Sequence, residues 1–314
     1  MNILYLAKAG YGGWASFTAH LAHSTGWPIY KITQRGEKKK RNFGWGLGYQ
    51  NLNIEQAEKM GPWIIACVVP GCQKFLKYFK GNYLVIHDPT ELRQDMKDYL
   101  PDYNVITIRE SVHDLLLQKF NILSEYLVHP FINLDTNTSL TKINKKGAIS
   151  VSRIDFDKNI DIIIETNDLI QEDEKKIEIY GCPNDIYVYH KLRKTNYKQY
   201  YKGKFDKSFS KIISLLKDKK YCVDMSSIFK DGGGSQYTFL EAINLGCCLI
   251  LNKKWVENMP TKFINGHNCL IVDSPEALKE ILEKDLDVTN IVENARALLK
   301  EHLDIDWKSI VSVD

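Results

Sequence analysis

The chain has 314 residues, of which 44% are apolar and 26% are charged, and its formal net charge is +3. This composition is that of an ordinary globular protein and excludes disordered, collagen-like and coiled-coil chains. At about 150 residues per domain, the length predicts two domains, each long enough to bury a core.

No run approaches the ~20 apolar residues that span a bilayer, and the start lacks the basic region and the length of a signal peptide. The seven cysteines are odd in number and never form a CxxC pair, so the sequence predicts neither a disulfide framework nor a zinc site. We therefore expect a cytoplasmic chain with no membrane partner and no metal.

Short runs rich in Ile, Val and Tyr alternate with amphipathic stretches, which is typical of βα units around parallel sheets. In the first half the pattern predicts strands at 2–7, 28–33, 63–69, 82–87, 104–108 and 124–128. It predicts helices at 14–24, 71–79, 90–99 and 111–120, the last with Ser111 as its N-cap and Asp114 completing a capping box.

A polar stretch at 133–147 is the predicted linker. Beyond it the pattern predicts strands at 148–152, 176–180, 200–203, 221–225, 247–251 and 268–272. The helices predicted there are 158–170, 207–217, 236–245, 275–284, 288–301 and 305–312. The fold class is α/β, with two parallel sheets facing a cleft, and ligands are expected outside the carboxyl ends of the strands.

A glycine-rich turn, with Gly10, Gly12 and Gly13, follows the first predicted strand. Glycines at such a turn let backbone N–H groups approach a phosphate, and a helix N-terminus favours negative charge. The turn matches neither a dinucleotide fingerprint nor a P-loop, so a tight turn without a ligand is an equal alternative.

His87 and Asp88 follow the fourth predicted strand, and Pro89 begins the next helix. At a strand's carboxyl end these two side chains are available to a substrate. The alternative is a polar turn whose groups are satisfied internally.

Two cations frame the first turn of the second domain, where a strand ends in Arg153 and Lys158 comes at the start of the next predicted helix. Such a pair can hold a pyrophosphate without a metal ion. The alternative is two exposed basic residues with no ligand.

Three glycines, Gly232 to Gly234, precede a predicted helix that carries Glu241 among apolar residues. The glycines and the helix N-terminus suit an anion, and a buried Glu needs a polar partner such as a ribose diol. The alternative is a helix Glu that faces solvent.

Positive charge is concentrated in two stretches. Residues 35–41 carry a net charge of +4, and residues 191–220 contain eleven Lys or Arg against Asp206 and Asp218. Such runs are usually solvated loops, and the other interpretation is a polyanionic partner.

Taken together, these residues resemble the GT-B glycosyltransferases, specifically the large retaining family that uses nucleotide-sugar donors. The match covers most of 147–284. Ser-Arg-Ile-Asp-x-Asp-Lys-Asn at 152–159, Ile-Tyr-Gly at 179–181, Tyr-Lys-Gly-Lys at 201–204, Phe-Leu-Glu-Ala at 239–242 and Asn-Gly-x-Asn at 265–268 occur in the family's order. The family usually has a Glu eight residues before the Glu241 position, where this chain has Gly233.

A second resemblance is to the DNA α-glucosyltransferase type of T-even bacteriophages, which modifies hydroxymethylcytosine. It rests on His87-Asp88 followed by Leu92-Arg93, and on the Tyr-Thr-x-Leu-Glu helix at 237–241. It implies retaining transfer of a sugar from a UDP-sugar to a hydroxymethylated base in DNA. No cofactor is required, and the location is the host cytoplasm if the chain is phage-encoded.

The resemblance also implies a domain plan and residue roles. Residues 1–140 form the acceptor domain, 146–298 the nucleotide-sugar domain, and a C-terminal helix in 299–314 returns to the first domain. The catalytic residues are Asp88 and His87. The donor residues are Gly12, Gly13, Arg153, Lys158, Ser235, Gln236, Tyr237, Thr238 and Glu241, and the DNA residues are Lys38, Lys39, Lys40, Arg41 and Arg93.

Two alternatives stay open at this point. One is a glycosyltransferase that acts on a cell-surface glycan or a lipid-linked acceptor. The other is a non-catalytic nucleotide- or DNA-binding module on the same fold, which Gly233 in place of the usual Glu keeps in play. The sequence leaves the sugar, the base and the oligomeric state open.

Overall fold

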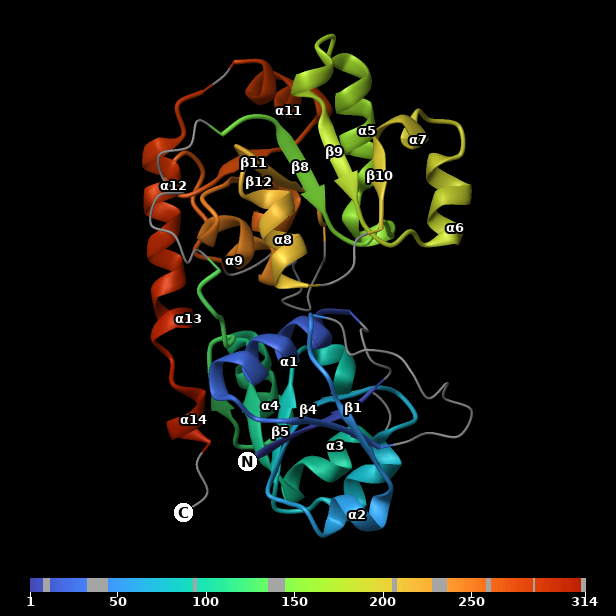
Figure 1. Ribbon diagram of the computed structural model, residues 1–314, viewed down its shortest axis with the longest axis vertical. Helices are drawn as coiled ribbons and strands as arrows, with labels where there is room; N and C mark the ends of the chain where they lie inside the picture. The colour runs from blue at the N-terminus through green and yellow to red at the C-terminus, as the bar shows by residue number, and fades with distance from the viewer. Residues whose placement is uncertain are drawn as a thin grey trace. The chain divides into compact units, whose positions relative to one another are not determined.

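The computed structural model describes residues 1–7, 12–32, 45–92, 95–134, 145–204, 208–227, 236–257, 261–284 and 286–311. The chain forms two compact units (Figure 1). Unit 1 contains Met1–Ile132 and Glu301–Asp314, and unit 2 contains Asn133–Lys300. Most of the predicted linker, residues 135–144, lies outside the described residues.

Unit 1 is built on a sheet of seven strands, all paired in parallel, in the order β3-β2-β1-β4-β5-β6-β7. The strands are β1 (Asn2–Leu6), β2 (Ile29–Ile32), β3 (Gln50–Leu52), β4 (Trp63–Val68), β5 (Tyr83–Ile86), β6 (Asn104–Thr107) and β7 (Glu125–Tyr126). The order 3-2-1-4-5-6 is that of the Rossmann fold. The sequence predicts all of these strands except β3, which is a three-residue edge strand with two polar residues.

The helices of unit 1 are α1 (Gly12–Thr25), α2 (Ile54–Glu58), η1 (Gln73–Tyr78), η2 (Pro89–Leu92), α3 (Met96–Tyr99), η3 (Leu100–Asp102), α4 (Glu110–Phe120) and α14 (Trp307–Ile310). The predicted N-cap at Ser111 is wrong, because α4 begins one residue earlier and Arg109 takes the extended cap conformation. A complete capping box occurs instead at α2, between Asn53 and Gln56.

The C-terminal segment completes the core of unit 1. Trp307 of α14 is 1% exposed, its ring meets Phe17 of α1 at 5.5 Å, and its indole N–H donates to the Val128 carbonyl at 3.1 Å. The last described helix therefore belongs to the same unit as the first strand.

Unit 2 has a second parallel sheet, in the order β10-β9-β8-β11-β12-β13. Its strands are β8 (Ala148–Val151), β9 (Ile177–Tyr180), β10 (Tyr201–Gly203), β11 (Tyr221–Asp224), β12 (Cys248–Asn252) and β13 (Leu270–Val272). This is again the Rossmann order, and the order reverses between β8 and β11.

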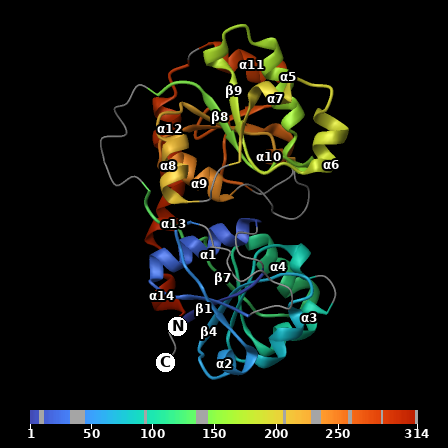
Figure 2. The ribbon, with the colours of Figure 1, turned by 45° about the vertical axis from the view of Figure 1, so that its right-hand side comes forward.

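The helices of unit 2 are η5 (Phe156–Lys158), α5 (Ile160–Leu169), η6 (Asp173–Lys175), α6 (Asp185–Tyr187), η7 (Val188–Leu192), α7 (Tyr197–Tyr200), α8 (Phe209–Leu216), α9 (Gln236–Asn244), α10 (Lys253–Glu257), α11 (Pro275–Glu283), α12 (Thr289–Arg296) and η8 (Ala297–Leu299). Helix α13 (Lys300–Asp304) leads into unit 1. Helices α5 and α11 cover one face of the sheet, and α8, α9 and α12 cover the other (Figure 2).

No helix in the described ranges has both the length and the apolar character needed to cross a membrane.

Gly181 allows the ends of β8 and β9 to approach closely. A Cβ atom added at Gly181 would overlap the carbonyl oxygen of Ser152, the residue that follows β8. The Gly181 N–H also donates to the Gly203 carbonyl at 3.1 Å, so this residue cannot move aside without breaking a bond to β10. Only a residue without a side chain fits here.

We predict that Gly181→Ala lowers the free energy of unfolding by about 1–3 kcal/mol, the usual cost of overpacking. Chemical denaturation measures the loss. Gly48→Ala is the matched control, since an added Cβ there has no atom within 4 Å. Equal stability of the two variants would contradict the close approach.

Candidate functional site

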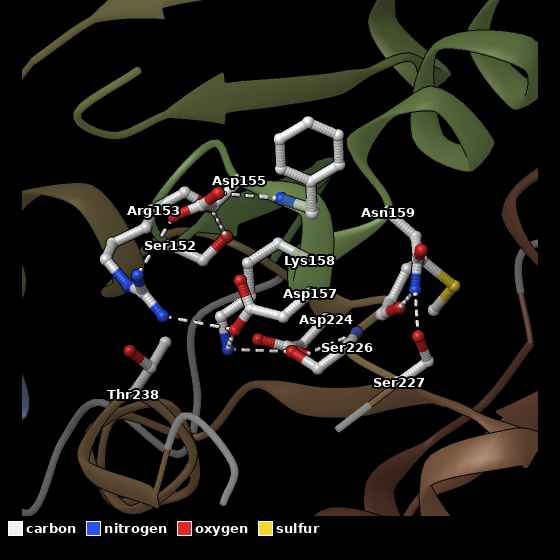
Figure 3. A network of polar contacts seen from close by, with 12 residues as sticks. Ser152, Arg153, Asp155, Asp157, Lys158, Asn159, Asp224, Ser226, Ser227 and Thr238 are labelled. Atoms are coloured by element: carbon white, nitrogen blue, oxygen red, sulfur yellow. Dashed lines mark hydrogen bonds and ion pairs between the residues drawn. The ribbon is translucent and has the colours of Figure 1, made fainter. Parts of the chain in front are cut away.

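The candidate site of unit 2 lies where the strand order reverses. At such a switch point the crossover connections leave in opposite directions, and a crevice forms outside the carboxyl ends of the strands. The turn after β8 carries Ser152, Arg153 and Lys158, and the loop after β11 carries Ser226 and Ser227. Figure 3 shows that the two segments meet through polar contacts.

Lys158 joins the two segments from a buried position. It is 5% exposed, and its Nζ lies 2.8 Å from Ser226 Oγ and 3.9 Å from Asp157 Oδ2. Asn159 adds two bonds, from its side-chain amide to the Met225 carbonyl and to Ser227 Oγ, at 2.8 and 2.7 Å. The ammonium group is therefore held in place by both loops.

Arg153 lies at the mouth of the same turn, with its side chain 57% exposed. Its guanidinium donates to Asp155 Oδ2 at 3.0 Å and to Asp157 Oδ2 at 3.1 Å (Figure 3). Asp157 thus contacts both cations and keeps them close together. The alternative of two exposed basic residues is wrong for Lys158.

Helix α9 brings a third element to this edge of the sheet. Thr238 Oγ1, in its first turn, lies 3.4 Å from the Val151 carbonyl at the end of β8. Glu241 is 2% exposed and Tyr237 is 8% exposed, so the alternative of a solvent-facing Glu241 is wrong. Burial, with the nearby Glu241 charge, raises the pKa of Tyr237 well above its ordinary value.

In unit 1, His87 is buried directly after β5. Its Nε2 lies 2.7 Å from the Ala66 carbonyl, so this nitrogen carries the proton, and the ring meets Phe17 edge-on at 4.7 Å. Burial lowers the pKa of His87 to about 4, which leaves the imidazole neutral at pH 7.

Asp88 is half-buried beside it. Its Oδ1 accepts the Thr90 N–H at 2.8 Å and the Thr90 hydroxyl, and these bonds hold the turn. Its Oδ2 has no hydrogen-bond or ion-pair partner within the described part of the chain. The alternative of a satisfied polar turn therefore accounts for only one of the two oxygens.

Glu91 is a residue to which the sequence analysis assigns no role. Its carboxyl group accepts the Trp14 indole N–H and, at 2.8 Å, the His87 backbone N–H. It ties helix α1, which follows the glycine-rich turn, to the turn that carries His87 and Asp88. Burial, helped by the Asp88 charge, raises the pKa of Glu91 to about 8. The sequence feature that could have identified Glu91 is its position as an acid one turn after His87 and Asp88.

Several predicted residues lie outside the described residues, so the structure does not place them. They are Gly10, Lys38, Lys39, Lys40, Arg41, Arg93, Gly232 to Gly234 and Ser235. Gly12 and Gln236 begin helices α1 and α9, and Gly13 is exposed in the first turn of α1. Among the described residues, no group of three or more His, Cys, Asp or Glu could hold a metal ion.

Solved structures resemble this chain over nearly its whole length. HepE (Alr3699) of Anabaena, solved with UDP and glucose, is 14% identical with a TM-score of 0.66, covering 99% of this chain and 97% of that chain. An α-glucosyltransferase solved with UDP and a 13-mer DNA containing an HMU base is 12% identical with a TM-score of 0.69, covering 96% and 95%. A glycosyltransferase of Rickettsia africae is 14% identical with a TM-score of 0.62, covering 99% and 95%.

No protein-family model matches the chain, and no curated protein matches it in sequence. At such low identities the likeness shows the fold, which is the two-domain GT-B fold. The predicted fold class, α/β with two Rossmann-like sheets, is confirmed.

We predict that the stability contribution of Glu91 falls as pH rises. The folded chain keeps the Glu91 proton up to about pH 8, whereas an unfolded Glu loses it near 4.5. The folded state then binds more protons than the unfolded state, so the contribution is lost between these values. In chemical denaturation from about pH 5 to 9, the free energy of unfolding of the wild type, minus that of Glu91→Gln, should fall with rising pH and then level off.

His87 titrates in both proteins and cancels from this difference. The exposed Glu110 offers a control for the change of an acid to an amide, and Glu110→Gln is measured over the same pH range. A Glu91→Gln difference that stays constant with pH would contradict the raised pKa.

Proposed function

We propose that this protein is a retaining glycosyltransferase that moves a sugar from a UDP-sugar to a hydroxymethylated base in DNA. The observation that carries the proposal is the pair of cations, Arg153 and Lys158, held together at the switch point of unit 2. The GT-B fold supports it, because fold neighbours were solved with UDP or UDP-glucose.

Sugar transfer requires stabilisation of the departing diphosphate, and this site offers fixed positive charge for it. Two guanidinium N–H groups of Arg153 donate to Asp155 and Asp157, and the other three of the five have no acceptor in the described part of the chain, so they are available to phosphate oxygens. Lys158 supplies a second charge, and the N-terminus of α9 supplies oriented N–H groups. Glu241, on the same helix, suits the ribose diol.

Retention is compatible with the groups found in unit 1. A retaining transfer on one face of the sugar lets the leaving phosphate accept the acceptor's proton, so a strong separate base is not needed. His87 is neutral and already donates its Nε2–H to Ala66. Asp88, with Oδ2 open, is the group we assign to contact the reacting hydroxyl or the sugar.

A DNA acceptor is supported by one group of fold neighbours, the α-glucosyltransferase solved with UDP and DNA. A hydroxymethyl group on a base is hard to reach inside the duplex, so such a base would be flipped out of the stack. Mass spectrometry of nucleosides, after incubation of the protein with hydroxymethylated DNA and a panel of UDP-sugars, tests the proposal.

Each outcome of that experiment has a distinct meaning. A glycosylated nucleoside supports the full proposal. Donor hydrolysis without a DNA product retains the glycosyltransferase and points to a glycan or lipid-linked acceptor. Absence of both a glycosylated product and donor hydrolysis supports the non-catalytic nucleotide- or DNA-binding module instead.

We predict that Arg153→Ala and Lys158→Ala each lower kcat by about 10²- to 10³-fold, because each removes charge that stabilises the leaving diphosphate. Steady-state donor turnover measures the effect. Lys175→Ala is a matched control, since Lys175 pairs with Glu172 at the opposite, N-terminal end of β9. Near-wild-type turnover in both site variants would reject the donor-site assignment.

We predict that Asp88→Asn abolishes transfer and leaves UDP affinity unchanged. Asn retains the Oδ1 acceptor that the Thr90 N–H requires, so the turn stays folded, but it removes the carboxylate charge. Calorimetric titration with UDP separates the two effects. Loss of UDP binding together with activity would place Asp88 in the donor site or in the framework of the fold.

A further inference from the structure

A short basic helix follows β9 in unit 2. Helix α6 and the π-helical turn η7 run without a break from Asp185 to Leu192. One side packs into the core through Tyr187 and Leu192, each 1% exposed. The other side presents two large apolar side chains, Ile186 at 63% and Tyr189 at 58% exposure.

The charge around this helix is one-sided. Residues 185–204, which include the helix, contain six Lys or Arg against a single acid, Asp185, although the whole chain has a net charge of only +3. Taken together, the rest of the chain is therefore net negative. Within the described ranges none of these six cations forms an ion pair, whereas Lys175, Lys279 and Lys284 each pair with a Glu.

An aromatic ring lies among these cations. The Arg193 guanidinium lies 4.6 Å from the Tyr189 ring centroid, and the His190 ring meets Tyr189 edge-on at 5.1 Å. An exposed aromatic ring beside unpaired cations is the combination that binds single-stranded nucleic acid, because bases stack on the ring and phosphates meet the charges.

The helix is firmly attached to the turn that carries Arg153. Asn184 Nδ2 donates to Asp155 Oδ1 at 2.8 Å, and the Tyr187 hydroxyl donates to Asp161 Oδ1 at 2.8 Å. The Phe156 ring meets the Tyr187 ring at 5.1 Å. A strand bound to this helix would therefore be held at a fixed position relative to the donor site of the same unit.

We propose that the basic helix face, formed by Ile186, Tyr189, His190, Lys191, Arg193 and Lys194, binds a nucleic-acid strand. A membrane is the weaker fit, because Arg193 lies over one of the two exposed apolar side chains of the helix. A neutral glycan would gain nothing from the unpaired cations. The proposal extends the DNA acceptor of the proposed function, but strand binding is measured without turnover.

The test compares two triple variants of the full chain by fluorescence anisotropy with a single-stranded and a duplex oligonucleotide. K191A/R193A/K194A removes three cations of the basic helix face. K175A/K279A/K284A removes three paired cations and changes the net charge equally. The first variant should weaken binding about tenfold or more, and each lost phosphate contact should flatten the log-log salt slope by about 0.9 for duplex and 0.7 for a single strand. The control should change neither.

The aromatic part has its own pair of variants. Tyr189→Ala should weaken single-strand binding about tenfold. Tyr189→Phe, which keeps the ring, should bind the single strand as tightly as the wild type does. Circular dichroism and UDP titration check that each variant is folded.

Three results would overturn the proposal. The first is an equal loss of oligonucleotide affinity in the two triple variants, and the second is no binding of either oligonucleotide by the wild type. The third is binding of the wild type to phosphatidylserine vesicles in place of DNA, weakened by K191A/R193A/K194A. Failure of the proposed function is seen separately, as absent transfer in a protein that still binds DNA through this face.

Discussion

The buried ammonium group of Lys158 fixes the arrangement on which the candidate site of unit 2 depends. An ammonium removed from water needs acceptors and negative charge, and Ser226 and Asp157 supply them. Meeting this need brings together the loops after β8 and β11. Arg153 then shares Asp157, so one carboxylate holds both cations. Because the two cationic side chains are already held in position, less conformational entropy is lost from the site when an anion binds.

Unit 1 orders its strand ends with neutral groups instead. Burial keeps the proton on Glu91 and keeps the His87 ring uncharged at neutral pH. Glu91 accepts hydrogen bonds from the Trp14 indole and the His87 backbone, and the His87 ring donates to the Ala66 carbonyl. In these protonation states neither side chain carries a net charge. The two candidate sites therefore differ in charge: unit 2 holds two cations close together, and unit 1 holds a turn in which Asp88 Oδ2 has no partner among the described residues.

The sequence predicted most strands because β-branched runs bounded by polar turns are local signals. The rule that ligands bind after parallel strands also pointed to Arg153, Lys158 and Asp88. Strand β3 was not predicted, because its residues pair with β2 through backbone groups that any sequence supplies. The contact between Trp14 and Glu91 joins residues far apart in the chain, so no local sequence pattern predicts it.

Unit 1 is assembled from two segments that lie on either side of unit 2 in the sequence, and this affects how the protein is made. Phe17 is translated before unit 2, yet Trp307, which packs on Phe17, is translated after it. All strands of unit 2 are therefore synthesised before the core of unit 1 is complete. A nascent chain that stops short of Trp307 would leave the apolar surface around Phe17 uncovered, a state prone to aggregation and open to chaperones and proteases.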